Sequence, residues 1–214
     1  MPSAAPRAVQ LYGIISLDVS GTSSPVRGVN LISFRELGAL VTDTTYAAPS
    51  PTTQHVAEYR RVVEGAFARQ TVVPAPFGSV FRSRDALMRW LELHYFTLNE
   101  AVTFVSDRAM ARVSVSYGEE PENTAAMSVD ADLLDTTADE SFRLLRRHAV
   151  ASLVMSHHAG GGAPAARASF LIERERWDMF NDIVREEQKR LREMQVECTG
   201  PWPPYDFVRM QFGA

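Results

Sequence analysis

Two adjacent histidines followed by a glycine run are the first residues of this chain whose types suggest chemistry. His157 and His158 precede Gly160–Gly162, and the only cysteine, Cys198, lies far downstream. Imidazole and thiolate are zinc ligands, but adjacent histidines point in different directions on a helix or a strand. No second pair of ligands with suitable spacing accompanies them. We therefore interpret the histidine pair as a solvated helix end and predict no metal site.

Motifs for phosphate binding and nucleophilic catalysis are incomplete. The glycine run lacks the Lys-Ser/Thr pair of a P-loop, and no G-x-G-x-x-G pattern follows a strand. Phe77-Gly78-Ser79 lacks the G-x-S-x-G pattern of a nucleophile elbow. The pair Glu119–Glu120 falls in a predicted turn, where a solvated face is the usual explanation.

The other histidines lie on predicted helices. His94 falls on an apolar stripe and is predicted to be a satisfied core histidine, whereas His55 and His148 have polar neighbours and no motif around them. A serine, histidine and aspartate set cannot be nominated from these residues. The sequence therefore predicts a protein that is not an enzyme and that has no cofactor.

Composition narrows the class further. The chain has 214 residues, of which 45% are hydrophobic and 22% charged, as in ordinary soluble globular proteins. Its net charge of −4 gives no electrostatic support for nucleic-acid binding. The single cysteine excludes an internal disulfide, and no stretch approaches the roughly 18 apolar residues of a membrane span. With no signal peptide recognised, we expect a cytoplasmic protein.

Periodicity in residues 9–107 predicts strands, a helix, a strand and a second helix. The predicted strands span residues 9–17, 29–34, 37–41 and 71–74. A turn near Gly38 is expected between the second and the third, and another turn over 75–81. The apolar face of the first helix is predicted to comprise Val56, Tyr59, Val63 and Phe67. Ser83 is a suitable N-cap for the second helix, which is predicted to run to about Asp107.

Residues 111–211 predict strand, helix, strand, helix, strand. The strands are placed at 113–117, 168–172 and 194–199, and the helices begin near Asp139 and Trp177. Such a half can close as a small antiparallel sheet with helices on one face, a ferredoxin-like plan. The expected fold class is therefore α+β with two small domains, 1–108 and 109–214, the second one ferredoxin-like.

The least ordinary segment is Gly200-Pro201-Trp202-Pro203-Pro204-Tyr205-Asp206-Phe207-Val208. Its prolines fix the backbone and remove donors, so it cannot be a helix or a central strand. Trp202 and Tyr205 either pin the C-terminal chain onto its own core or bind a partner, and the first alternative is favoured because aromatics are so often core. A PxxP-type ligand is disfavoured because the segment is short and tied to a strand.

This nonamer resembles the C-terminal signature of the gas vesicle protein F/L family. Leu11-Tyr12-Gly13-Ile14 resembles the family's opening strand, and Val73–Phe81 resembles its central Leu-Pro-x-Arg-Phe-Gly-Thr-Val-Phe segment. Ala168–Ile172 resembles its strand before the long helix. The matches follow the family's order over most of the chain. Pro76 and Ser79 depart from the usual Arg and Thr, so any partner contact or ion pair of that Arg is absent here.

The resemblance implies two α+β domains, the second ferredoxin-like, and a role in gas vesicle formation. It also implies contact with the small hydrophobic gas vesicle shell protein and with other gas vesicle accessory proteins. The candidate contact residues are Phe77, Trp202 and Tyr205. The alternative is a small-molecule-binding enzyme or sensor on a ferredoxin-like scaffold, which would need a deep pocket with converging polar groups.

Overall fold

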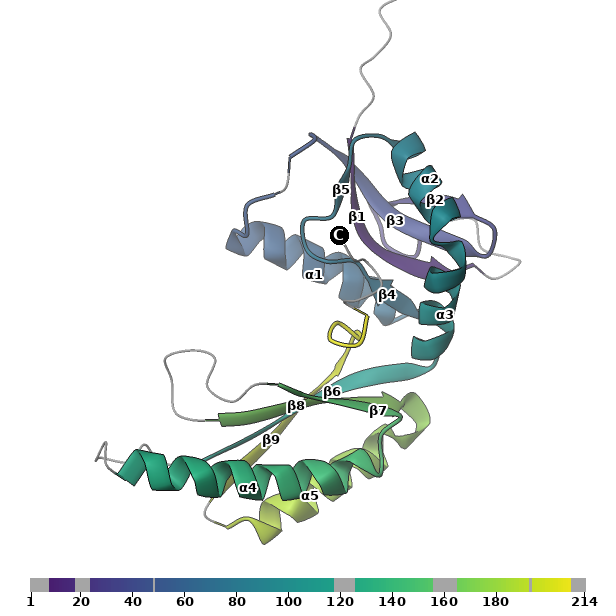
Figure 1. Cartoon of the computed structure of the whole chain (residues 1–214). Coiled ribbons are helices and arrows are strands. Elements are labelled where there is room, and N and C mark those ends of the chain that lie inside the picture. Colours follow the sequence, from purple (N-terminus) through teal and green to yellow (C-terminus); the bar gives the residue numbers. More distant parts are fainter. Residues whose placement is uncertain are drawn as a thin grey trace, which may run out of the picture. The chain divides into compact units, whose positions relative to one another are not determined.

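The computed structural model describes residues 8–17, 24–47, 49–117, 126–155, 165–192 and 194–208. Glu119–Glu120, His157–His158 and Gly160–Gly162 lie outside these residues. The chain divides into two compact units (Figure 1). Unit 1 contains the described residues up to Ser106 and those from Pro203 onward, and unit 2 contains Asp107–Trp202.

Unit 1 is built on an antiparallel sheet in the order β2-β3-β1-β4, with β5 also paired to β1. The strands are β1 (Ala8–Ser16), β2 (Asn30–Phe34), β3 (Leu37–Thr44), β4 (Val72–Pro74) and β5 (Val80–Phe81). β1 lies in the middle and is buried along most of its length, which explains its nearly continuous apolar sequence. Pro74 ends β4, since proline cannot donate to a ladder.

Three helices accompany this sheet: α1 (Thr53–Phe67), α2 (Arg84–Leu93) and α3 (Tyr95–Val105). The hydroxyl of Thr52 caps α1 and that of Ser83 caps α2, each by accepting a backbone N–H of the first turn. The apolar stripe of α2 and α3 packs on the sheet through Leu87, Leu91 and Leu98, which are fully buried.

Four features of unit 1 differ from the sequence-based expectation. The turn expected over 75–81 ends in a short strand, because Val80 and Phe81 pair with β1. The turn between β2 and β3 is at Arg35–Glu36, and Gly38 lies within β3, where an added Cβ would come 2.7 Å from Leu31 Cδ1. The helix expected to run unbroken to Asp107 is interrupted at His94, which is half-buried at the break and is not a core residue. Val56 is 36% exposed, because α1 buries Val62 and Ala66 instead.

Unit 2 has the element order β-α-β-β-α-β. Its elements are β6 (Arg108–Tyr117), α4 (Ala126–Arg146), β7 (Ala151–Met155), β8 (Ala165–Glu173), the 3₁₀ turn η1 (Arg174–Arg176), α5 (Trp177–Arg190) and β9 (Met194–Trp202). The strands form an antiparallel sheet in the order β7-β8-β6-β9. Both helices lie on one face of this sheet (Figure 1). This is the order of elements that a ferredoxin-like plan requires.

Alternation along the strands separates the two faces of this sheet. Ala111, Val113 and Val115 of β6 point to the helix side and join the core with Phe170 and Phe180. Between the helices, the buried carboxylate of Glu187 accepts hydrogen bonds from Ser141 Oγ at 2.7 Å and from Arg190. These hydrogen bonds lower the pKa of Glu187 despite its burial, that of Arg190 contributing most.

The sequence pattern missed β7 and placed the start of α4 too late. β7 is a five-residue edge strand whose Leu153 and Val154 are 42% and 50% exposed, so it carries no clear alternation. β9 also continues through Gly200 and Pro201 to Trp202, as an edge strand on which proline is tolerated. Gly200 has φ 138°, and a Cβ there would approach Trp177 Cη2 to 2.7 Å.

The tail after β9 belongs to unit 1. Pro203 and Pro204 are buried, and Val208 is 2% exposed within the core cluster of unit 1. We expected residues 109–214 to form one domain, but the tail from Pro203 onward belongs to unit 1. The physical reason is that Val208 belongs to a core cluster whose other buried members, such as Val73 and Val102, all lie in unit 1.

Candidate interaction site

Two of the three expected contact residues meet on a single tyrosine of unit 1. Tyr59 on α1 lies at the centre of an aromatic cluster with Tyr12, Phe77 and Tyr205, whose ring centroids are 6.3, 5.7 and 6.3 Å away. Tyr59 is only 8% exposed, and Phe77 and Tyr205 are half-buried. We call these four residues the Tyr59 cluster.

Hydrogen bonds fix this cluster to the backbone of its own unit. The hydroxyl of Tyr59 donates to the carbonyl of Ala75 at 2.5 Å, and burial raises its pKa. In the tail, the Tyr205 and Phe207 amides donate to the carbonyls of Pro203 and Pro204. Tyr205 thus packs the tail onto Tyr59 of unit 1, whereas the pinning alternative placed it on the core of residues 109–214.

The third expected residue, Trp202, lies in unit 2. It pairs with Met110 of β6 at the end of β9 and is half-buried. Its indole Nε1–H donates to Thr199 Oγ1 at 3.2 Å. Trp202 and Tyr205 therefore belong to different units, although only two residues separate them in the sequence.

A second group of aromatic residues, which the sequence pattern did not single out, flanks the break at His94. Phe96 and Leu93 are 78% and 79% exposed. Tyr95 packs edge-on against Phe96 at 5.4 Å and against Phe34 of β2 at 5.8 Å. We call Phe34, Leu93, Tyr95 and Phe96 the Tyr95 patch. The sequence does contain a signal for this patch, because Leu93 and Phe96 lie outside the apolar stripe that α2 and α3 bury.

The β2–β3 turn supplies charged groups to this patch. The guanidinium carbon of Arg35 lies 4.7 Å from the centroid of the Tyr95 ring, within the range of a cation–π contact. The Tyr95 hydroxyl donates to the carboxylate of Glu36. This hydrogen bond lowers the pKa of Glu36 and raises that of Tyr95. The patch is thus a preformed apolar surface with a polar rim, a composition typical of protein–protein contacts.

The histidines and the cysteine do not form a metal centre in the described part of the chain. No group of three or more His, Cys, Asp or Glu side chains among the described residues could hold a metal ion. His94 packs against the Trp90 ring at 5.1 Å, and His55 Nδ1 lies 2.8 Å from the carbonyl oxygen of Ser50. Burial raises the pKa of Cys198 to about 11, which disfavours its reactive thiolate at neutral pH.

No helix in the described ranges is both long enough and apolar enough to span a membrane.

Comparisons with known proteins agree on one family. The family model for gas vesicle synthesis protein GvpL/GvpF matches residues 8–140 and 132–209. Gas vesicle proteins F1 and F2 of Halobacterium salinarum are 24% and 27% identical over 211 and 212 residues. Each alignment covers 95% of this chain and 93% of the relative.

A solved structure shows the same fold. The crystal structure of GvpF from an Anabaena species superposes with a TM-score of 0.78 at 15% identity, covering 95% of this chain and 99% of that one. The likeness confirms the α+β class with two antiparallel sheets. Because the family model spans more than half of the sequence, the chain belongs to the gas vesicle synthesis protein L/F family.

Proposed function

We propose that this protein is a non-enzymatic assembly factor of gas vesicle formation that binds the small hydrophobic shell protein. It works in the cytoplasm and on the growing vesicle, together with other gas vesicle accessory proteins. The observation that carries the proposal is the exposure of Leu93 and Phe96, at 79% and 78%, on the Tyr95 patch. Two large apolar side chains exposed three positions apart on either side of a helix break are typical of a surface that a partner covers.

The chemistry of the patch suits an apolar chain that must not aggregate. Phe96 and Leu93 offer apolar area, while Arg35 and Glu36 keep the rim hydrated. Tyr95 packs edge-on against both Phe34 and Phe96, so one side of the Phe96 ring is already in contact before a partner binds, which reduces the ordering cost of binding. The factor would cover an apolar stretch of the shell protein until that stretch joins the wall.

Phe77, Trp202 and Tyr205 remain proposed contact residues, in a secondary role. Each ring is half-buried and keeps some accessible surface. Their first contacts are within the chain, to Tyr59 for Phe77 and Tyr205 and to Thr199 for Trp202. A loss of binding on their substitution would therefore need to be separated from a loss of folding.

Co-purification with the shell protein tests the proposal. Tagged full-length protein is co-expressed with the shell protein, and the recovered shell protein is quantified. We expect the Leu93→Ser/Phe96→Ser variant to recover at least about tenfold less, since central apolar contacts dominate interface energies. The matched control is Tyr46→Ser, which removes a 71% exposed aromatic of the same unit outside the patch. Equal recovery by the double variant and the control would exclude the patch as the binding surface.

A further inference from the structure

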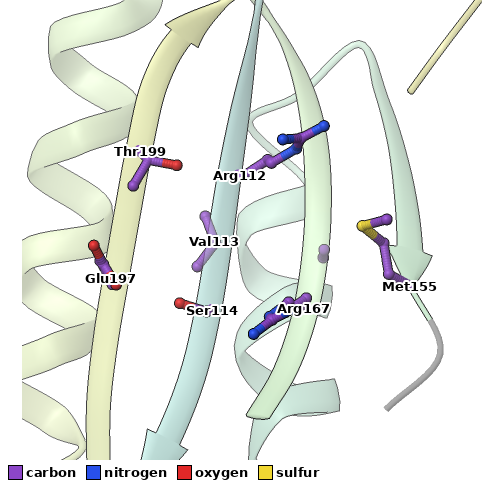
Figure 2. A pocket seen from close by; sticks show the side chains of 8 residues that line it. Arg112, Val113, Ser114, Met155, Arg167, Glu197 and Thr199 are labelled. Atoms are coloured by element: carbon purple, nitrogen blue, oxygen red, sulfur yellow. The ribbon is translucent and has the colours of Figure 1, made fainter. Parts of the chain in front are cut away.

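The face of the unit 2 sheet opposite its helices carries a set of polar side chains. Figure 2 shows a hollow there, with the helices behind the strands. Its volume is about 280 Å³. It is lined by Arg112 and Ser114 of β6, Arg167 of β8, Glu197 and Thr199 of β9, and Met155 of β7. The Tyr95 patch belongs to unit 1, so this surface goes beyond the function proposed above.

Strand register places these groups in two neighbouring rows. Ser114 pairs with Arg167 on one side and with Glu197 on the other. In the next row, Arg112 pairs with Ser169 and with Thr199. Arg112 and Arg167 are therefore diagonal neighbours on adjacent strands. The Cα atoms of such a pair lie roughly 7–8 Å apart.

The lining of this hollow carries more basic than acidic side chains, in contrast to the chain as a whole. Two guanidinium groups accompany one carboxylate, and all three side chains are exposed. The chain carries a net charge of −4, so the face is a local exception. Arginine binds carboxylates through a planar fork of donors, and two hydroxyls beside it add further donors. The complementary ligand is a pair of carboxylates.

The shape of the face favours a polypeptide over a small anion. β6 is paired on both sides, with β8 and with β9, so its backbone N–H groups are used within the sheet. Only side chains can then hold the ligand, and a small anion would stay largely hydrated. In an extended segment, alternate residues lie about 6.6 Å apart on one side, close to the separation of the two arginines. A Glu-x-Glu sequence in extended form meets this spacing.

We propose that the helix-free face of the unit 2 sheet binds an acidic extended segment of a partner protein through Arg112 and Arg167. Ser114 and Thr199 add hydroxyl hydrogen bonds to the same carboxylates. Glu197 limits the affinity, because it places a like charge beside the bound segment. Charge complementarity identifies the occupant, since a second copy of the same net positive face would be repelled.

Fluorescence anisotropy with the full-length protein tests this proposal. The probe is a labelled peptide of sequence Thr-Glu-Thr-Glu-Thr-Glu, and the comparison peptide has glutamine at each glutamate. We expect Arg112→Gln/Arg167→Gln to weaken binding of the acidic probe by on the order of tenfold. Glu197→Gln is expected to strengthen it by about twofold to threefold, a gain that misfolding could not produce. The matched control, Arg185→Gln, removes an exposed arginine of α5 and should leave binding unchanged.

Three results would overturn the proposal. The first is equal affinity for the glutamine peptide, which would show that carboxylates are not recognised. The second is unchanged binding in the double arginine variant, or weakened binding in Glu197→Gln. The third is competition by inorganic phosphate or by a single-stranded oligonucleotide at lower concentrations than the acidic peptide, which would identify a different ligand class.

Discussion

Unit 1 contains two tyrosines with similar aromatic neighbours and different roles. Tyr59 is 8% exposed, and its hydroxyl donates to a backbone carbonyl inside the unit. Tyr95 is half-buried, and its hydroxyl donates to the exposed carboxylate of Glu36. The Tyr59 cluster closes the C-terminal tail onto the core, whereas the Tyr95 patch leaves Phe96 open to solvent. Both residues are tyrosines, so residue type does not explain their different roles. The difference comes from where each residue lies relative to the helix stripe that faces the core.

The largest expected effect comes from removing the centre of the buried cluster. Tyr59→Ala should lower the free energy of unfolding of unit 1 by about 3–5 kcal/mol, because it opens a cavity and leaves the Ala75 carbonyl without its donor. Urea denaturation followed by circular dichroism measures this loss. The control is Phe96→Ala, expected within about 0.5 kcal/mol of wild type because the ring is exposed. Similar losses in the two variants would erase the distinction between cluster and patch.

A smaller effect should come from the rim of the same cluster. Tyr205→Ala removes a half-buried ring that packs on Tyr59, so we expect a loss of about 1–2 kcal/mol, confined to the tail. Hydrogen exchange at the Phe207 amide, which donates to Pro204, reports opening of the tail directly. Faster exchange there with unchanged protection in β6 is the expected pattern. Unaltered exchange at Phe207 would show that the buried Pro203, Pro204 and Val208 hold the tail without Tyr205.

Much of the fold follows from local sequence rules. Strands β1 to β4, the capped start of α2, and β6, β8 and β9 were predictable from apolar runs and an N-cap residue. The α+β class follows from their order. β5 was not predictable, because its two residues fall in a proline- and glycine-containing segment that is typical of a turn. β7 was not predictable, because a short, half-exposed edge strand has neither an apolar run nor clear alternation. The break at His94 was hidden because α2 and α3 keep one continuous apolar stripe across it.

The expected contact residues illustrate a second limit. The tail motif identified Trp202 and Tyr205 as rigid aromatics, but their places depend on tertiary contacts. Tyr205 lies on Tyr59, more than a hundred residues away, while Trp202 stays in the β9 ladder. Such long-range contacts leave no periodic signal in one sequence. The helix-free face of the unit 2 sheet could not be predicted either, because only the strand register brings Arg112, Arg167 and Glu197 together.

The smallest expected effect concerns the hydrogen bond at the edge of the Tyr95 patch. The Tyr95 hydroxyl is the main cause of the lowered pKa of Glu36, so Tyr95→Phe should raise that pKa toward its ordinary value. A carboxyl with a depressed folded pKa contributes stability above its unfolded pKa and loses it as pH falls through the folded value. Because Glu36 is fully exposed, the change should be visible in its titration and negligible in stability.

An NMR titration of the Glu36 side-chain carboxyl carbon resolves this shift. Tyr12→Phe serves as the control, since Tyr12 bonds to Thr42 and makes no contact with Glu36 among the described interactions. We expect a higher midpoint in Tyr95→Phe and no change in Tyr12→Phe. If Tyr95→Phe left the midpoint in place, the lowered pKa of Glu36 would have to come from its backbone hydrogen bond or from the charge of Arg35. A salt series separates these two causes, because added salt screens the charge of Arg35 and leaves the backbone hydrogen bond in place.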